Sequence, residues 1–280
     1  MVSKISKKNI FKKILKEIKK GLRRIYWYSF TKFKYFYLSL KFVFFKKKIF
    51  KHKISLLLPS RERPQKFDRM LSSLINTCQD ISRIEIIILL DSNDRYIEKY
   101  QYIVDQNKET INIQIFTIDL KTHAIRNNFL AKKSTGDLIF PINDDMIFVS
   151  NKWDYYLDKE FSKNESYSPF CVWINAGNRY KYFHCDFPIV NRKWYERLGY
   201  IGSEYFNFWY LDRWICELSI RSKSFLLSYK IIVKQFSAHS NQNEVDNTHL
   251  INIQSGNQSK DDVIWHETNK QRIIESKKLL

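Results

Sequence analysis

Glycine is scarce in this sequence, which has only six in 280 residues. No two of them are spaced as G-x-G-x-x-G, and none belongs to a phosphate loop that ends in Gly-Lys followed by Ser or Thr. Both motifs need glycine because the backbone there must approach a phosphate closely. The scarcity argues against dinucleotide-dependent dehydrogenases and P-loop NTPases.

Cysteine is also scarce, and the four that occur form no C-x-x-C pair. A cysteine zinc site and a dense disulfide framework both need more cysteines at closer spacing. We therefore expect free thiols in a reducing cytoplasm. The four are Cys78, Cys171, Cys185 and Cys216.

Acidic residues are almost missing from the start of the chain. Residues 1–53 contain 18 Lys or Arg and one acidic residue, whereas residues 54–280 contain 30 Lys or Arg and 28 acidic residues. The formal net charge of +19 therefore belongs almost entirely to an N-terminal basic arm. No repeat or low-complexity linker divides the rest, which predicts one nearly neutral domain over residues 54–280.

The basic arm has no long hydrophobic run. Residues 11–25 have the period of an amphipathic helix with lysines on one face, and an aromatic-rich stretch that lysines interrupt follows to residue 45. No uncharged run approaches the roughly 18 residues that cross a bilayer. Aromatic rings and lysines suit an anionic membrane surface, but they also suit nucleic acid, and a solvated tail is a third interpretation. The density of rings favours the membrane surface, because so many are costly to leave in water.

The remaining chain alternates between apolar runs and helical periodicity. Ile54–Leu58 is an apolar run that Pro59 ends, and Pro64 then opens a helix at its first turn. The alternation up to residue 142 predicts an α/β fold with a mainly parallel sheet and helices on both faces. Further strands are predicted at 84–90, 111–118, 138–142, 170–174, 183–190 and 225–233, and further helices at 96–104, 123–133 (stopped by Gly136), 151–161, 191–198 and 211–220.

Polar side chains follow three of the predicted strands. They lie in the segments Ser60–Arg63, Asp91–Asp94 and Asn143–Asp145. The carboxyl ends of parallel strands meet at one edge, where such folds bind ligands. Asp144 and Asp145 offer hard oxygen ligands of the kind that Mg²⁺ and Mn²⁺ prefer, although an acidic pair also suits a plain polar turn. Together the three segments favour a nucleotide site.

Four segments of the chain together resemble the family 2-like glycosyltransferases of the GT-A fold. They are Leu58–Pro64, Leu90–Asp94, Ala124–Asn127 and Gly136–Phe148, and the resemblance is thinner over residues 170–265. It implies a Rossmann-like GT-A domain with a nucleotide-sugar half at 54–150 and an acceptor half at 151–280. It also implies a donor site made of Pro59, Ser60, Arg61 and Arg63 against the nucleotide, Asp91 on the base or ribose, Arg126 near the diphosphate and Asp144 toward the sugar.

The same resemblance implies a divalent metal ion, Mn²⁺ or Mg²⁺. Asn143–Asp145 is similar to the family's Asp-x-Asp motif, with Asn in place of the first Asp, and Asp145 is the implied metal ligand. His239 follows the last predicted strand, where related enzymes often place a histidine near the metal or diphosphate. A single histidine is also commonly structural, so both interpretations of His239 stay open.

A catalytic carboxylate is implied at the start of the predicted helix 211–220. Asp212 is the candidate, although the family's Glu-Asp pair is Leu211-Asp212 here. A sugar hydroxyl is a weak nucleophile, so a carboxylate must take its proton as it attacks the anomeric carbon. Aspartate also favours the N-cap of a helix, which is the competing structural role for Asp212. For Asp261-Asp262 we expect capping of a last helix.

The resemblance implies a metal-dependent transferase that moves a sugar, with inversion, from a UDP-sugar to a glycan or lipid-linked acceptor in cell-surface polysaccharide synthesis. The basic arm would hold it peripherally at the cytoplasmic membrane face. One alternative is a sugar nucleotidylyltransferase, but the loop after the first strand lacks the glycines typical of that class. The other is a nucleic-acid-binding protein with a catalytically silent domain, which we rank lower.

Overall fold

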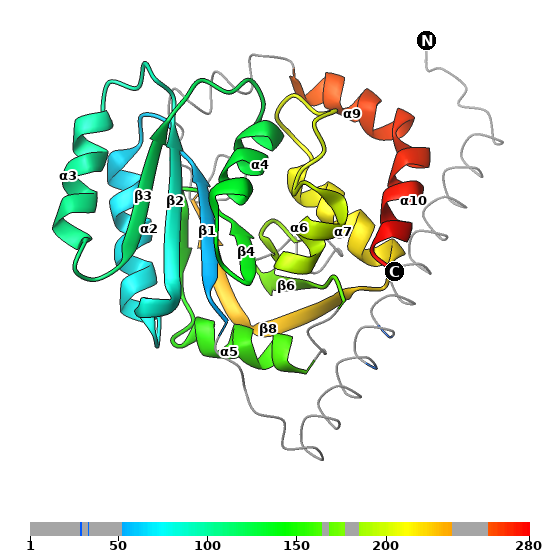
Figure 1. Ribbon diagram of the computed structural model, residues 1–280, viewed down its shortest axis with the longest axis horizontal. Helices are drawn as coiled ribbons and strands as arrows, with labels where there is room; N and C mark the ends of the chain where they lie inside the picture. The colour runs from blue at the N-terminus through cyan, green and yellow to red at the C-terminus, as the bar shows by residue number, and fades with distance from the viewer. Residues whose placement is uncertain (1–28, 30–32, 34–51, 164–167, 177–184, 237–256) are drawn as a thin grey trace, which may run out of the picture.

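The computed structural model describes Ser29, Phe33 and residues 52–163, 168–176, 185–236 and 257–280. Within these residues, eight strands form one sheet in the order β3-β2-β1-β4-β7-β6-β8-β5. Helices lie on both sides of it (Figure 1). The helix predicted at 11–25 and nearly all of the basic arm lie outside the described residues, as does His239.

The first half of the sheet is parallel, as the sequence predicts. Strand β1 pairs with β2 and β4, and β2 pairs with β3. The chain moves outward from β1 to β3 and then returns to the other side of β1, so α4 lies on the face opposite to α2 and α3 (Figure 1). The elements are β1 Ile54–Pro59, α2 Pro64–Thr77, β2 Ile84–Leu90, α3 Ile97–Asn107, β3 Asn112–Thr117, α4 His123–Lys133 and β4 Leu138–Pro141.

The second half of the sheet is mixed. Strand β7 is antiparallel to β4 and β6, β8 is parallel to β6, and β5 is antiparallel to β8. The sequence predicts neither the short β5 nor the division of the C-terminus into two helices. The elements are β5 Met146–Phe148, α5 Trp153–Ser162, β6 Cys171–Asn175, β7 Pro188–Asn191, α6 Arg192–Leu198, α7 Leu211–Arg221, β8 Phe225–Gln235, α9 Asn257–Glu267 and α10 Asn269–Lys278, and the single-turn helix η1 Ile81–Arg83 precedes β2.

Local signals set several of these boundaries. Pro64 occupies the first turn of α2, where its missing N–H costs no hydrogen bond. The Asn191 side chain caps α6 by accepting a hydrogen bond from the Trp194 N–H. Asp261 and Asp262 lie inside α9 and not at its start, so the prediction that they cap the last helix is wrong.

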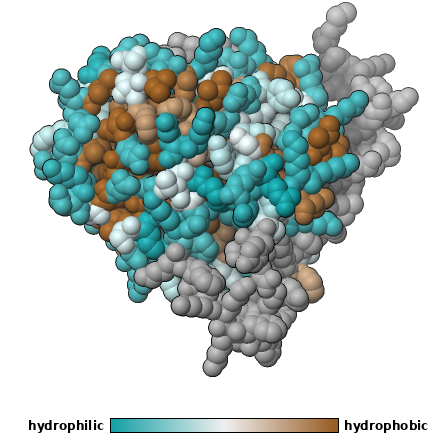
Figure 2. Space-filling view, viewed as in Figure 1, coloured by the Kyte–Doolittle hydropathy of each residue, from teal (hydrophilic) through white to brown (hydrophobic). Residues whose placement is uncertain are grey.

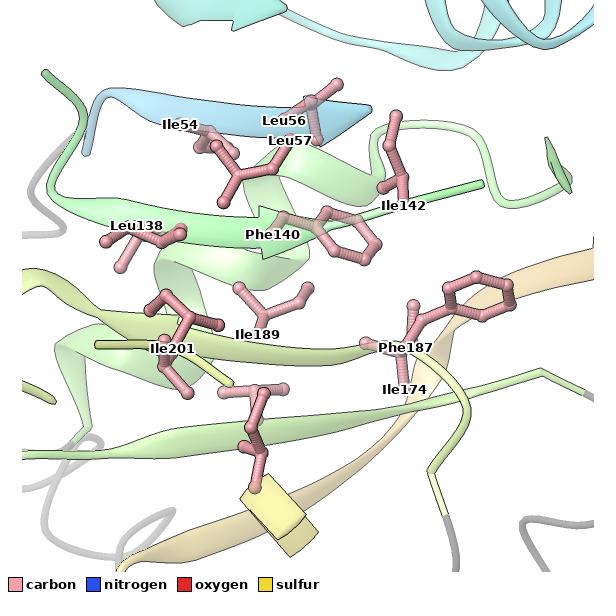
Figure 3. Close-up of a cluster of buried hydrophobic side chains, with 14 of the residues drawn as sticks. Ile54, Leu56, Leu57, Leu138, Phe140, Ile142, Ile174, Phe187, Ile189 and Ile201 are labelled. Atoms are coloured by element: carbon pink, nitrogen blue, oxygen red, sulfur yellow. The ribbon is translucent and has the colours of Figure 1, made fainter. Parts of the chain in front are cut away.

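The main core lies between the sheet and its helices. Strands β1, β4, β6 and β7 contribute apolar side chains that meet in one cluster (Figure 3). Four tryptophans, Trp153, Trp173, Trp194 and Trp214, are completely buried. They are therefore core residues, whereas Trp209 is only half-buried.

Gly136 is needed for a reason other than the predicted one. Helix α4 ends at Lys133 with Ser134 as its C-cap, so Gly136 does not stop the helix. A Cβ atom at Gly136 would lie 2.5 Å from Ser55 Oγ and 2.7 Å from the Ser55 backbone nitrogen. The close approach of this turn to β1 therefore excludes a side chain.

A buried charged cluster closes the amino end of the sheet. Arg83 Nη2 lies 2.9 Å from Asp154 Oδ2, and Arg83 Nη1 lies 2.7 Å from Asp158 Oδ2. The two aspartates also accept hydrogen bonds from the backbone N–H groups of Gln79, Asp80 and His52. The cluster ties α5 to the segment before β2 and to the residues that lead into β1.

The surface seen in Figure 2 is largely hydrophilic, but apolar side chains gather on it in more than one place, most of them on the left of the view. One group covers α9 and α10, where Val263, Ile273, Ile274 and Leu280 are exposed. In the part of the chain that the structure describes, no helix has both the length and the apolar character needed to span a membrane.

Candidate functional site

The ends of β1 and β4 lie side by side at the carboxyl edge of the sheet, where the strand order reverses. Such a switch point is where open α/β sheets bind ligands. Ser60, just after β1, donates a hydrogen bond of 2.6 Å to Asp144 Oδ2, just after β4. Arg63 Nη1 lies 3.2 Å from the other oxygen, Asp144 Oδ1. Two segments more than 80 residues apart thus hold both oxygens of one buried carboxylate.

Burial and charge act in opposite directions on Asp144. Burial raises the pKa of this carboxyl to about 6, and the neighbouring Asp145 adds to the rise, whereas Arg63 and Ser60 lower it. Both aspartates are almost completely buried. The closeness of the two carboxylates makes it costly to ionise both, and a cation bound between them would reduce this cost.

Residues at the end of β8 hold Asp145 in place. Its backbone oxygen accepts a 2.8 Å hydrogen bond from the Phe236 N–H, and its Oδ1 lies 3.3 Å from Gln235 Nε2. Among the described residues, no group of three or more His, Cys, Asp or Glu side chains forms a ready metal cage. The Asp144–Asp145 pair nevertheless fits Mg²⁺ or Mn²⁺, because these ions use one or two carboxylates together with substrate phosphate oxygens.

Asp91 lies between two guanidinium groups. Arg126 Nη2 bonds to Asp91 Oδ1, and Arg61 Nε lies 3.5 Å from Asp91 Oδ2. Arg126 Nε also donates to the Leu120 carbonyl at 2.9 Å. The structure therefore brings together three of the predicted donor-site residues, with Asp91 in contact with both arginines. A ribose or base that bonded to Asp91 would have to share these oxygens.

Tyr100 was not predicted as part of this site. Its hydroxyl lies 2.7 Å from Ser60 Oγ and accepts a 2.9 Å hydrogen bond from the Arg63 N–H. Because Ser60 donates to Asp144, the tyrosine donates to Ser60, and the three form a chain. Burial raises the pKa of the Tyr100 hydroxyl, so it stays protonated. A tyrosine on the otherwise apolar buried face of α3 was the available signal.

Asp94 organises the first loop from the neighbouring strand end. Its Oδ2 accepts a 2.7 Å hydrogen bond from the Glu62 N–H, and its Oδ1 accepts one of 2.8 Å from the Tyr96 N–H. Glu62 has a left-handed backbone, with φ of 54°, which a residue other than glycine rarely adopts. The carboxylate thus stabilises the turn that presents Arg61 and Arg63 on either side.

Asp212 is the second residue of α7 and not its N-cap, which is Tyr210. Its Oδ1 nevertheless accepts a 2.7 Å hydrogen bond from the Arg213 N–H in the first turn of the helix. The start of α7 faces the start of α4, because a Cβ atom at Gly202 would meet Leu211 of α7 at 2.2 Å and Ala124 of α4 at 3.2 Å. Asp212 therefore lies near the helix that carries Arg126.

His123, at the start of α4, interacts electrostatically with both Arg126 and Asp212. Burial and, to a smaller extent, the charge of Arg126 lower its pKa to about 4, although Asp212 acts in the opposite direction. The imidazole is therefore neutral at pH 7. Its ring centroid lies 5.6 Å from that of Phe208, in the segment before α7. No pattern along the chain singles out His123 as a site residue.

Comparison with known proteins gives similarity of fold without similarity of sequence. No protein-family model and no curated protein sequence matches the chain. Solved structures do match. The mannosyltransferase PcManGT from Pyrobaculum calidifontis, in complex with GDP-Man and Mn²⁺, has a TM-score of 0.54 at 12% identity, over 68% of this chain and 59% of that one. The chain has a GT-A-like glycosyltransferase fold.

A second group of matches is S. aureus TarS. Its residues 1–349 in complex with UDP-GlcNAc give a TM-score of 0.51 at 11% identity, over 69% of this chain and 61% of that one. The same segment in complex with UDP gives a TM-score of 0.52. This GT-A-like chain thus spans about 60% of the length of these matched chains. In this fold the predicted donor residues lie at the carboxyl edge of the sheet.

Proposed function

We propose that this protein is a glycosyltransferase that moves a sugar from a nucleoside-diphosphate sugar to a hydroxyl group. The observation that carries the proposal is the meeting of unlike charges at one sheet edge. Arg61 and Arg126 are oriented by Asp91 on one side, and two buried carboxylates follow β4 on the other. Cationic groups beside a carboxylate pair suit a diphosphate bound together with a divalent cation.

Asp144 and Asp145 are the residues that would hold the metal ion. Bound there with a diphosphate, Mn²⁺ or Mg²⁺ would neutralise the charge that the leaving nucleotide gains. Arg126 adds a fixed positive charge for the same purpose, because its guanidinium is held by Asp91 and the Leu120 carbonyl before any substrate arrives. Preorganised charge of this kind is worth more than flexible charge, since it needs no reorganisation during the reaction.

Asp212 is the proposed general base. The acceptor oxygen attacks the anomeric carbon, its proton passes to the Asp212 carboxylate, and the bond from the anomeric carbon to the diphosphate breaks with its electron pair on the phosphate oxygen. A single displacement from the opposite side inverts the anomeric centre. The neutral His123 beside Asp212 adds no positive charge that would weaken the base.

Calorimetry with the full chain tests the donor site. UDP, GDP, CMP and ATP would each be titrated with and without Mn²⁺, and we expect Mn²⁺-dependent binding of UDP. Asp145→Ala should abolish the effect of Mn²⁺, whereas Asp105→Ala, at an exposed position on α3, should not. A preference for GDP would indicate a GDP-sugar as the donor and would leave the proposed reaction class unchanged. Absence of binding by all four nucleotides would contradict the proposal.

Hydrolysis of the sugar nucleotide tests the base, because water can replace an unknown acceptor. Asp212→Asn should bind nucleotide as tightly as the wild type but release nucleoside diphosphate at least about a hundredfold more slowly. An unchanged rate would indicate that Asp212 only stabilises the first turn of α7 and is not the base. The anomeric configuration of the released sugar, followed by NMR, tests inversion.

For the basic arm we propose a role at an anionic membrane surface, which would bring the enzyme to a glycan or lipid-linked acceptor at the cytoplasmic face. The support is its composition, 18 Lys or Arg among interleaved aromatic residues. The full chain should sediment with vesicles that contain anionic lipid and not with neutral ones. Replacement of five lysines by glutamine should weaken this binding, and a preference for nucleic acid at physiological salt would contradict it. The five are Lys12, Lys13, Lys16, Lys19 and Lys20.

A further inference from the structure

Asp261 of α9 is a completely buried carboxylate that reaches into another part of the fold. Its Oδ1 accepts hydrogen bonds from the Asn207 N–H at 2.8 Å and from Asn207 Nδ2 at 2.9 Å. Its Oδ2 accepts hydrogen bonds from the Phe208 N–H at 3.0 Å and the Trp209 N–H at 2.8 Å. Three consecutive backbone donors thus converge on one side chain.

Consecutive N–H groups that point to one place form a concave anion site. Here a carboxylate of the same chain fills it, from a helix more than 50 residues further along. A buried charge is costly unless hydrogen bonds compensate it. Four donors compensate Asp261, and the carboxylate in turn fixes the backbone conformation of residues 207–209.

These three residues lead directly to the proposed base. Tyr210 follows them with a left-handed backbone, φ of 76°, and forms the N-cap of α7. Asp212 comes two residues later, so the direction in which α7 starts depends on how residues 207–209 are held. Phe208, whose N–H bonds to Asp261, also places its ring against His123 at the donor side.

Helix α9 holds Tyr210 through a second set of contacts. Trp265 lies one turn after Asp261 on the same face of α9, and its ring stacks on that of Tyr210 at 5.1 Å between centroids. The guanidinium group of Arg272, in α10, lies over the Trp265 ring at 3.8 Å from its centroid. The Tyr210 hydroxyl donates to Asp262. The C-terminal helices therefore hold the segment before α7 through ring stacking and hydrogen bonds.

We propose that Asp261 is a positioning residue for the acceptor side of the active site. It holds residues 207–209 so that α7 presents Asp212 to the acceptor, and it has no part in binding the nucleotide. The inference rests on the proposed function, because it takes Asp212 as the base. It assigns the C-terminal helices to the acceptor half of the catalytic machinery and not only to the packing of the domain.

Amide hydrogen exchange in the full chain tests the contact itself. The amides of Asn207, Phe208 and Trp209 should exchange at least tenfold more slowly in the wild type than in Asp261→Asn, because asparagine offers one acceptor oxygen to four donors. Glu267→Gln removes a charge from an exposed position at the end of the same helix and should leave the exchange unchanged. Rapid exchange of these amides in the wild type would overturn the proposal without any variant.

Kinetics then separate positioning from general stability. For sugar-nucleotide hydrolysis, Asp261→Asn should keep the nucleotide dissociation constant and the KM within twofold of the wild type while kcat falls at least tenfold. Equal loss of binding and kcat would indicate general damage to the fold and overturn the specific role. An unchanged kcat would also overturn the proposed role of Asp261. If the wild type neither binds nor hydrolyses a sugar nucleotide, the proposed function itself fails. If the wild type is active and Asp261→Asn is equally active, only the role of Asp261 fails.

A milder variant covers the case in which Asp261→Asn does not fold, as judged by its circular dichroism. Asn207→Ala removes one of the four donors and leaves α9 intact. It should give a several-fold decrease in kcat, with faster exchange at Phe208 and Trp209. Wild-type values for both would overturn the proposal.

Discussion

The two ends of the sheet each bury a pair of aspartates, but they treat the negative charge differently. At the amino end, Asp154 accepts two backbone N–H bonds and pairs with Arg83, and these contacts lower the pKa of its carboxyl below the usual range although burial opposes them. At the carboxyl end, burial raises the pKa of Asp144 to about 6, and the contacts with Arg63 and Ser60 only partly offset it.

This difference separates a structural cluster from the proposed binding site. The charge at the amino end is satisfied within the protein, so nothing further is needed there. At the carboxyl end the pKa of Asp144 stays raised, which is the condition under which a bound cation would stabilise the ionised carboxylate. Burial alone therefore does not identify the functional carboxylates, whereas burial with incomplete compensation does.

The same substitution at the two ends gives the largest contrast. Asp154→Asn should destabilise the fold by about 3 kcal/mol, because asparagine offers one acceptor oxygen to two backbone N–H groups and the buried Arg83 guanidinium, and Arg83 then keeps only Asp158 as a close charge partner. Nucleotide affinity should stay within twofold of the wild type. Urea unfolding measures the first quantity and calorimetry the second. Loss of less than about 1 kcal/mol would show that the amino-end cluster is as poorly compensated as the site.

Asp144→Asn should have the opposite pattern. The free energy of unfolding should change by less than about 1 kcal/mol, because the substitution removes a carboxylate whose charged form is disfavoured by burial. Mn²⁺-dependent nucleotide affinity should fall about thirtyfold, equivalent to about 2 kcal/mol. A strongly destabilised variant that still binds nucleotide would reverse the roles of the two ends.

The pH dependence of binding sharpens the comparison further. The folded-state pKa of Asp144, about 6, lies above its ordinary value of 3.8, so this carboxyl takes up a proton as pH falls from 7 to 5. Mn²⁺-dependent nucleotide affinity should therefore fall about tenfold over this range, following the ionised fraction. Asp154, whose pKa is lowered, stays ionised throughout, so it stabilises the fold above pH 4 and loses this effect only in stronger acid. A binding curve that is flat between pH 5 and 7 would contradict the assignment.

The smallest effect is expected at Tyr100. Removal of its hydroxyl in Tyr100→Phe takes the acceptor from the half-buried Arg63 N–H and releases Ser60, which should cost about 1–2 kcal/mol of stability. Nucleotide affinity should fall about threefold, since Asp144 keeps its direct contacts. Tyr102→Phe, at an exposed position on the same helix, is the matched control and should change neither quantity.

Much of the fold could be predicted from the sequence because the signals are local. The apolar run of β2 at Ile84–Leu90 and the helical period of α4 at His123–Lys133 coincide with the predicted ranges. Periodicity reflects which side of an element is buried, and adjacent residues along the chain record it. The short β5 at Met146–Phe148 was missed because three residues carry no period.

The candidate site could be predicted only in part. The strand-end position of Asp144 and Asp145 follows from an apolar run that ends in acidic residues, and a parallel sheet requires such ends to meet. Which atoms meet does not follow. Nothing near Tyr100 in the sequence indicates that its hydroxyl supports Ser60, and nothing near His123 indicates that it lies close to Asp212.

The sequence by itself determined the parallel α/β half of the domain, the edge at which polar residues gather and the charge of the basic arm, because each depends on residues that are neighbours along the chain. Only the tertiary structure decided the partners. Asp144 is held by Ser60 from 84 residues away, and Asp261 is turned from an expected helix cap into the acceptor of amides more than 50 residues earlier. Such pairings depend on which groups lose water together when the elements pack, and no local pattern records that choice.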